Sequence, residues 1–217
     1  MQKSIGIKNH GPRGKDRRTL KDIEAYPTPK EIYAKILESP GWDYKSNMEF
    51  YRKRDRALVV LQYLLSLRIS EELRLVRGQF EVMEDSIIVK GIKLSKSRLK
   101  NKPRKHQFRE EAIIPLDDER QELTKLLVDY LEDPTFYDKN KNLLKDKPLF
   151  LFGPHRAWEI TIAVLGIPDH WLRAYGEDFL YEFMHYDILA LASYLKVEPR
   201  TLQEYIRKRW KKYFKNP

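Results

Sequence analysis

Cysteine is absent from the 217 residues of this sequence. Its absence excludes disulfide bonds and thiolate metal sites, and it suits an intracellular protein. No run of about 18 apolar residues occurs, so no segment is expected to span a membrane. The first residues also lack the apolar stretch of a secretory signal peptide. Together these absences predict a cytoplasmic protein.

Motifs for common cofactors are missing as well. The sequence has no G-x-x-x-x-G-K-[ST] phosphate-binding loop and no H-E-x-x-H zinc motif. Its histidines, at positions 10, 106, 155, 170 and 185, lack the spacing of metal ligands. The cluster Asp117-Asp118-Glu119 resembles a metal-binding carboxylate group, but helix capping explains it more simply. We therefore predict neither a metal nor a cofactor.

Positive charge, by contrast, is in excess. The chain has 42 Lys and Arg against 32 Asp and Glu, which gives a formal net charge of +10. This balance favours a polyanionic partner, namely DNA, RNA or an anionic membrane surface.

Two segments carry much of this positive charge. Residues 1–26 are polar and contain Arg13, Arg17 and Arg18. We expect a flexible arm that lies along DNA phosphates, with a solvated tail as the alternative. The second segment is the predicted tip of a long hairpin, where we expect DNA contacts from Lys96, Arg98, Lys100, Lys102, Arg104 and Lys105.

Local signals predict mostly helices with one group of strands. Thr28-Pro29-Lys30-Glu31 has the capping box of a helix start. A helix from about Met48 to Ser66 ends in a nearly continuous apolar stretch and should be the central buried helix. Residues 79–116 have the alternation of three strands. Further helices are expected at about 155–165, 170–184, 187–195 and 199–214. The predicted fold is α+β, mostly α-helical, with a small three-stranded antiparallel sheet.

Three finer predictions concern the ends of these elements. Ser70 can cap a short helix that follows Arg68. Asp117 or Asp118 is expected to cap the helix whose apolar side begins at Leu123. Residues 149–152 are predicted to form a short buried segment.

Two arginines, a histidine and a late tyrosine stand in a characteristic order. Arg68 lies in Ser66-Leu67-Arg68-Ile69-Ser70-Glu71-Glu72-Leu73, and His170 and Arg173 form a His-x-x-Arg box. Tyr205 comes nine positions after Lys196. Over roughly residues 28–214 this pattern resembles the catalytic domain of tyrosine recombinases, the phage-type integrases. That family has Gly-Leu-Arg-Ile-Ser-Glu-Leu, His-x-x-Arg, and a Leu-Gly-His turn nine positions before its tyrosine. Ser66 replaces the family's first glycine, and Lys196 stands where a histidine or tryptophan is usual.

The resemblance implies a role for each of these residues. Arg68 and Arg173 would bind the scissile phosphate, since a guanidinium donates paired hydrogen bonds and stays charged. His170 would contact the same phosphate and help to take the proton of the nucleophile, Tyr205. Lys196 would be a further phosphate donor. The family's general-acid lysine lies on the hairpin between the second and third strands, where Lys93 fits best and Lys90 and Lys96 are rivals.

Plainer readings of the same residues stay open. Arg68 could pair with Glu71 or Glu72 at a helix end, and His170 could serve a helix start. Lys196 could be a solvated turn lysine. Tyr194 and Tyr213 are near enough in sequence to compete with Tyr205 as the nucleophile.

We therefore predict a site-specific recombinase or integrase of a mobile element or virus, which acts on double-stranded DNA and associates with the nucleoid. A type IB topoisomerase-like enzyme and a non-catalytic DNA-binding protein are the alternatives. Residues 27–217 are expected to form the catalytic domain, without the N-terminal core-binding domain that usually precedes it.

The end of the chain suggests self-association on DNA. Ile206, Trp210 and Phe214 recur every four residues with cations between them, as in an amphipathic helix. Its apolar face could pack on its own domain or, as in many members of the resembled family, on a neighbouring protomer.

Overall fold

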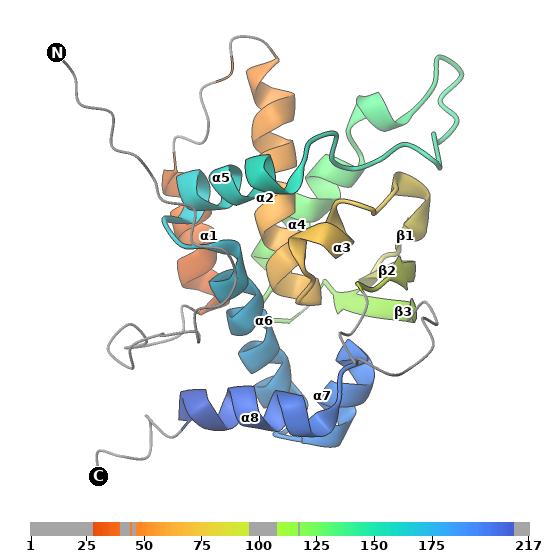
Figure 1. Ribbon diagram of the computed structural model, residues 1–217. Helices are drawn as coiled ribbons and strands as arrows, with labels where there is room; N and C mark the ends of the chain where they lie inside the picture. Colours follow the sequence, from red (N-terminus) through yellow and green to blue (C-terminus); the bar gives the residue numbers. More distant parts are fainter. Residues whose placement is uncertain (1–27, 40–43, 45–46, 96–107, 117, 211–217) are drawn as a thin grey trace, which may run out of the picture.

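The computed structural model describes residues 28–39, 44, 47–95, 108–116 and 118–210 (Figure 1). The predicted arm, the basic hairpin tip, Asp117 and Tyr213 lie outside the described residues. The helices are α1 (Pro29–Glu38), α2 (Met48–Leu65), α3 (Ile69–Glu72), α4 (Gln121–Leu131), α5 (Pro154–Leu165), α6 (Asp169–Phe183), α7 (Ile188–Leu195) and α8 (Pro199–Trp210). The strands are β1 (Phe80–Val82), β2 (Ser86–Lys93) and β3 (Phe108–Pro115), with short 3-10 turns at Arg77–Gln79 and Pro134–Phe136. The predicted fold class is confirmed.

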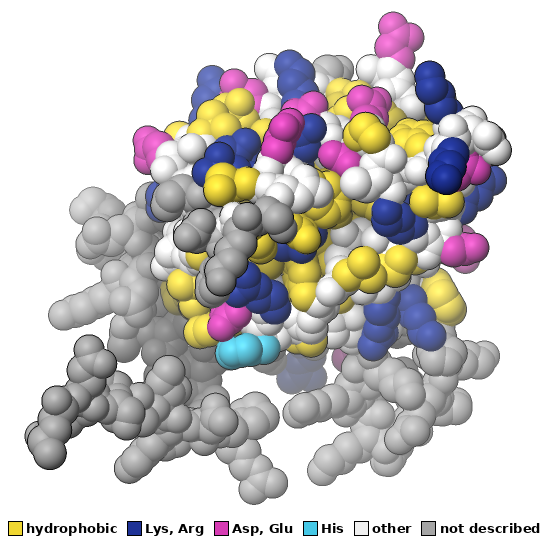
Figure 2. Space-filling view, turned by 90° about the horizontal axis from the view of Figure 1, so that it is seen from above, with side chains coloured by type: hydrophobic (Ala, Val, Ile, Leu, Met, Phe, Trp, Pro, Cys, Tyr) yellow, Lys and Arg dark blue, Asp and Glu magenta, His cyan; other side chains and the backbone are white. Residues whose placement is uncertain are grey.

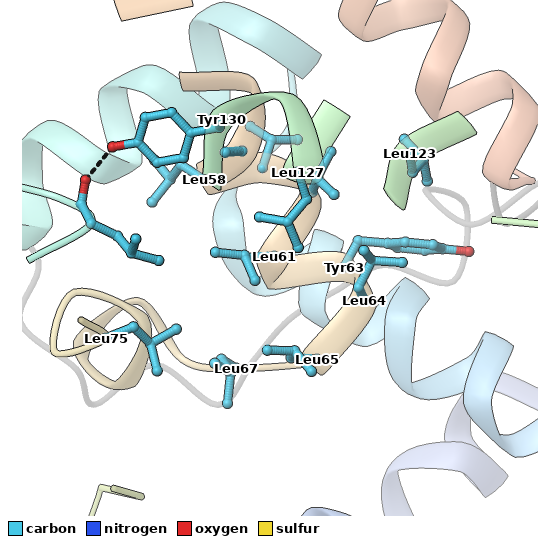
Figure 3. Close-up of a cluster of buried hydrophobic side chains, with 14 of the residues drawn as sticks. Leu58, Leu61, Tyr63, Leu64, Leu65, Leu67, Leu75, Leu123, Leu127 and Tyr130 are labelled. Carbon is cyan, nitrogen blue, oxygen red and sulfur yellow. Dashed lines mark hydrogen bonds between the residues drawn. The ribbon is translucent and has the colours of Figure 1, made fainter. Parts of the chain in front are cut away.

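Helix α2 is the central element, as its apolar second half predicts. Every residue from Ala57 to Leu65 is buried, and α2 contacts α4, α5 and α6. Figure 3 shows Leu58, Leu61 and Leu64 of α2 facing Leu123 and Leu127 of α4. Burying such a side chain stabilises the fold by about 1.5–3 kcal/mol. Across the described residues, none of the helices is both long and apolar enough to cross a membrane.

The starts of α1 and α6 lie close to where the sequence predicts them. Thr28 and Glu31 form the expected capping box, in which the Glu31 carboxylate accepts from the Thr28 backbone at 2.7 Å. Pro168 is the N-cap of α6, so the His-x-x-Arg box begins at the second residue of that helix. His170 therefore lies in the first turn of α6 and Arg173 in the next.

The sheet is antiparallel, in the order β1-β2-β3. Its burial pattern changes phase at Gly91, because Ile87 and Val89 are buried before it and Ile92 and Leu94 after it. Gly91 has a φ of 65°, which glycine adopts without strain. The Gln79 amide donates to the carbonyls of Lys90 and Gly91, both at 2.9 Å. On β3 the same phase change turns Arg109, the partner of Ile92, into the interior.

Helices α7 and α8 share a small second core with the end of α6. It contains Leu180, Leu191, Ala192, Leu195, Leu202 and Ile206. In Figure 1 these two helices lie at the bottom of the molecule, below β3 and the lower end of α6. Ile206 therefore packs within its own chain, as one of the two predicted alternatives had it.

Two predictions about helix starts are wrong. Ser70 lies inside α3, because the Glu71 carboxylate accepts from the Arg68 backbone N–H and the helix starts earlier. The N-cap of α4 is Arg120; Asp118 instead accepts from the Arg120 backbone at 2.7 Å in the preceding turn. The prediction of a buried segment at 149–152 is right in part, because Leu149 and Phe150 are buried but Leu151 is 78% exposed.

Candidate active site

Arg68 is held by Glu71 at the start of α3. Its Nη1 lies 2.8 Å from the Glu71 carboxylate, and its backbone N–H donates to the same group at 2.8 Å. The Ser95 backbone N–H, just beyond β2, also donates to Glu71 at 2.8 Å. Glu71 is buried, but about half of the Arg68 side chain is exposed. The predicted pairing of Arg68 with a neighbouring glutamate is therefore present, and it leaves the guanidinium accessible.

The pKa of Glu71 reflects this arrangement. Burial alone would raise it, but hydrogen bonds from the Arg68 and Ser95 backbones and the Arg68 guanidinium lower the pKa below its usual value. The carboxylate is therefore ionised at neutral pH and anchors the arginine.

Ser66 occupies the position where the recombinase pattern has glycine. It caps the C-terminus of α2 with a φ of 52° and a ψ of 39°. This left-handed conformation favours glycine, since a Cβ makes it costly. Ser66 nevertheless adopts this conformation and ends α2. Arg68, two residues later, is about half exposed.

Arg173 lies on α6, one turn after His170. Its Nε and one Nη both lie 2.9 Å from the Glu177 carboxylate. The Glu177 side chain is 10% exposed and that of Arg173 19%, so this pair faces the edge of the core. The His170 side chain is 50% exposed, and its ring centroid lies 6.1 Å from that of Trp171. His170 and Arg173 share one side of α6 by their spacing.

A close helix crossing brings the two arginine segments together. A Cβ built on Gly176 would lie 2.1 Å from the Tyr63 carbonyl oxygen and 2.8 Å from the Ser66 hydroxyl. Only glycine fits such an approach without movement of the backbone. Gly176 is one turn beyond Arg173, and Ser66 is two residues before Arg68. The crossing of α2 and α6 therefore sets the His-x-x-Arg box beside the Arg68 turn.

A third arginine at this place was missed in the sequence. Arg109 of β3 is only 2% exposed, and its Nη1 donates to the Leu65 carbonyl at 3.0 Å. Burial lowers the pKa of its guanidinium, Tyr194 and Glu71 act to raise it, and Arg173 acts to lower it. Arg109 is therefore electrostatically coupled to both halves of the site. The signal for it was a basic residue opposite Ile92, at an inward position beyond Gly91.

The hairpin lysines differ in their contacts. Lys93 is the last residue of β2 and is exposed. The ammonium of Lys90 lies 2.9 Å from Glu81 on β1. Lys90 therefore pairs toward β1, which lies on the other side of β2 from β3. Lys96 lies outside the described residues. Lys93 therefore stays the preferred general-acid candidate.

Lys196 and Tyr205 belong to the α7–α8 pair. Lys196 ends α7 with a φ of 54° and is exposed. It thus makes the turn itself, in the conformation that glycine favours. Tyr205 lies in α8 between the buried residues Leu202 and Ile206, and its side chain is outside the described part. Tyr194 is half-buried in α7 under the Arg109 guanidinium.

Glu72 is a buried acid beside this site. It is fully buried, and neither carboxylate oxygen has a hydrogen-bond partner in the described part of the chain. Burial, together with Asp169 at the start of α6, raises its pKa well above the usual value. Folding therefore favours the neutral form of this acid more than water does.

No cluster of three or more His, Asp or Glu side chains suited to a metal ion occurs within residues 28–39, 44, 47–95, 108–116 and 118–210. On the face seen in Figure 2, basic and acidic side chains are interspersed with apolar ones.

Comparison with known proteins identifies the fold. No model of a known protein family matches the sequence, and no curated protein matches it. Among solved structures, the chain is similar to the XerH site-specific recombinase bound to a palindromic difH substrate in a post-cleavage complex. The TM-score is 0.55 at 18% identity, over 87% of this chain and 52% of that one. A pre-cleavage complex of XerH with difH gives a TM-score of 0.54 at 18% identity, over 87% and 51%.

This likeness shows the fold alone. The chain has the fold of a tyrosine recombinase catalytic domain, with mostly helices and one small antiparallel sheet. It spans about half the length of the XerH chains that it matches.

Proposed function

We propose that this chain is the catalytic part of a site-specific DNA recombinase, which cleaves and rejoins strands through a phosphotyrosyl bond to Tyr205. The observation that best supports this is the α2–α6 crossing at Gly176. It joins an exposed arginine, Arg68, to the His170–Arg173 box, two segments far apart in the sequence. Guanidinium groups and an imidazole are side chains that suit the binding of a phosphodiester.

The arginines would stabilise the charge that develops in the reaction. As the tyrosine oxygen attacks phosphorus, negative charge grows on the non-bridging oxygens of the phosphate. Each arginine already holds a buried glutamate, Arg68 with Glu71 and Arg173 with Glu177. These pairs fix the guanidinium planes, and the remaining N–H groups can then face the phosphate. Such fixed donors cost no reorganisation when the transition state forms.

Two proton transfers complete the cleavage step. The bond between the Tyr205 oxygen and phosphorus forms as the bond from phosphorus to the 5′ oxygen breaks. The phenolic proton passes to His170, and Lys93 gives a proton to the leaving 5′ hydroxyl. The 3′-phosphotyrosyl bond keeps the energy of the phosphodiester, so a second 5′ hydroxyl can reverse the step without ATP. Lys196, at the turn before α8, would add a further phosphate contact.

DNA contacts outside the reacting phosphate come from the basic segments. We assign backbone binding to the arm 1–26, with Arg13, Arg17 and Arg18, and to the hairpin tip 96–105. Each phosphate neutralised by a cation releases counterions, so affinity falls steeply with salt. Removal of residues 1–26 should flatten the slope of log K against log salt, and an unchanged slope would assign the arm no DNA role.

Self-association on DNA is a further part of the proposal. Leu202 and Ile206 pack within the chain, while Trp210 extends the same periodic face. We propose that Trp210 anchors a neighbouring protomer when the protein assembles on its target. Trp210→Ala should reduce assembly on DNA, measured by sedimentation, more than it reduces the melting temperature. One wild-type protomer for each target site would contradict this.

The direct test is covalent capture on nicked suicide DNA substrates in EDTA. The wild-type protein should give a protein–DNA band on a denaturing gel, and Tyr205→Phe should give none at similar DNA affinity. A strict requirement for Mg²⁺ would instead indicate a nuclease. Relaxation of supercoiled plasmids of any sequence by a monomer would indicate the type IB topoisomerase alternative.

A further inference from the structure

We propose that Arg109 is a positioning residue, which sets the α7–α8 pair against the rest of the domain through the ring of Tyr194. This inference rests on the proposed function, because α7–α8 carries Lys196 and Tyr205. Arg109 itself is buried and contacts no DNA in this proposal. Its effect on cleavage is exerted through the placement of these two residues.

Arg109 connects β3 with the end of α2 and with α7. Its backbone belongs to β3, and its Nη1 donates to the Leu65 carbonyl at the end of α2, at 3.0 Å. Its guanidinium carbon lies 4.7 Å from the centre of the Tyr194 ring on α7. One side chain thus touches the strand, the end of the central helix and the helix that leads to the nucleophile.

The α7–α8 pair needs such a connection because its core is separate. The small core of α7, α8 and the end of α6 is a cluster distinct from the main core. Within the described part of the chain, Tyr194 is the one residue that packs against both of them. The Arg109 guanidinium covers the ring of this shared residue. Loss of either partner should therefore loosen α7–α8 more than it loosens the main core.

Burying the charge of Arg109 costs desolvation free energy, so stability alone does not explain an arginine at this position. The side chain is 2% exposed, and its Nε has no acceptor in the described part of the chain. No carboxylate pairs directly with it among those residues, although Glu71 lies near enough to raise its pKa. A buried apolar side chain often stabilises a fold as well as a buried cation does. A methionine could not, however, donate to Leu65 and present a cation to Tyr194 at once.

Catalysis would depend on this placement. Arg68 is held at the start of α3 and Arg173 on α6, whereas the proposed nucleophile lies on α8, which packs on α7. A displacement of the nucleophile by about 1 Å can cost on the order of a hundredfold in rate. A contact that fixes α7 relative to β3 and α2 is therefore expected to affect cleavage without affecting DNA affinity.

The test compares Arg109→Met and Tyr194→Leu with the conservative Tyr194→Phe in the full chain. Hydrogen exchange reports the looseness of α7–α8, and single-turnover cleavage of suicide DNA reports the chemistry. Arg109→Met and Tyr194→Leu should each raise exchange in α7–α8 by about tenfold or more, with less than about threefold change in α2 and α4. Cleavage should fall by about thirtyfold or more at DNA affinity within about threefold of wild type. Tyr194→Phe keeps the ring and should stay within about threefold of the wild-type rate.

Arg120→Met is the matched control. Arg120 is also a buried arginine over a ring, 4.8 Å from the centre of Phe179, but it is the N-cap of α4 and does not belong to β3. Its loss should lower stability without a selective rise in α7–α8 exchange. Should Arg109→Met fail to fold, Tyr194→Leu carries the same test.

Two results would overturn the inference. One is an equal rise in exchange across α2, α4 and α7–α8, and the other is unchanged exchange in α7–α8. Absence of any covalent complex with the wild-type protein would instead refute the proposed function. Exchange would then still decide whether Arg109 positions α7–α8.

Discussion

Glu71 binds Arg68 at two points, one on its backbone and one on its guanidinium. The carboxylate accepts from the Arg68 backbone N–H at 2.8 Å and pairs with its Nη1 at 2.8 Å. It also accepts from Ser95, so a single buried acid joins the α3 start to the end of β2. The exposed arginine is thereby held in one orientation at the end of the central helix.

Replacing Glu71 should therefore damage both the fold and the site. Glu71→Gln keeps the shape but removes one acceptor and the charge, and leaves a buried donor without a full partner. We expect a loss of about 1–3 kcal/mol in the free energy of unfolding by urea, together with slower DNA cleavage. The matched control is Glu81→Gln, which breaks the exposed pair with Lys90 and should cost less than about 1 kcal/mol. An equal loss of unfolding free energy in the two variants would show that the Glu71 pair contributes no more than an exposed ion pair does.

The stability that Glu71 contributes should depend on acid pH. Its folded pKa is lowered relative to the ordinary value of 4.5. A lowered acid pKa stabilises the fold above that value, and the contribution is lost as the pH falls through the folded pKa. The difference in unfolding free energy between wild type and Glu71→Gln should thus be constant near neutral pH and shrink below about pH 4.5. A difference that grows in acid would contradict the assigned pairing.

Glu72 should show the opposite pH dependence. Its folded pKa lies well above 4.5, so the folded state binds a proton more tightly than the unfolded state does. Stability is therefore highest below about pH 4.5 for this group and falls as the pH rises toward the folded pKa. Glu72→Gln, which cannot ionise, should gain stability over wild type as the pH rises from 5 to about 8 in thermal unfolding. No change in this difference across that range would mean that Glu72 stays paired or hydrated.

The two candidate phosphate ligands should be sensitive to the shape of the cation. Arg68→Lys and Arg173→Lys keep the positive charge but lose the planar fork that donates paired hydrogen bonds. We expect each to cost several kcal/mol in transition-state stabilisation, nearly as much as alanine does. Single-turnover cleavage at saturating protein measures this effect apart from binding. Lysine variants that cleave at near the wild-type rate would exclude bidentate contacts to the phosphate.

Much of the fold could be predicted because local signals and burial agree. The capping box at Thr28 and the apolar half of α2 each place an element where the structure has it. Two helix starts were predicted wrongly because a carboxylate accepts from a backbone N–H outside the expected capping position: Glu71 from Arg68, and Asp118 from Arg120. N-cap preferences judge each residue type by itself, and they do not predict which backbone N–H a nearby carboxylate will accept from.

The parts of the candidate site that could not be predicted depend on tertiary contacts. Gly176 looks unfavourable inside a helix, and its reason is the Tyr63 carbonyl of another helix. Arg109 is polar in sequence but buried in the structure, because it pairs with Ile92 just after the burial phase of β2 changes at Gly91. Its partners, Leu65 and Tyr194, are distant in the chain. No periodicity encodes such a pairing.

The most direct test of the account is to identify the residue that carries the DNA. The covalent complex formed on a suicide substrate is digested with nuclease and trypsin, and the modified peptide is sequenced by mass spectrometry. The account predicts a nucleotide-phosphate adduct on Tyr205, in the tryptic peptide from Thr201 to Arg207. An adduct on Tyr194 or Tyr213, or none under conditions where the protein binds DNA, would contradict it.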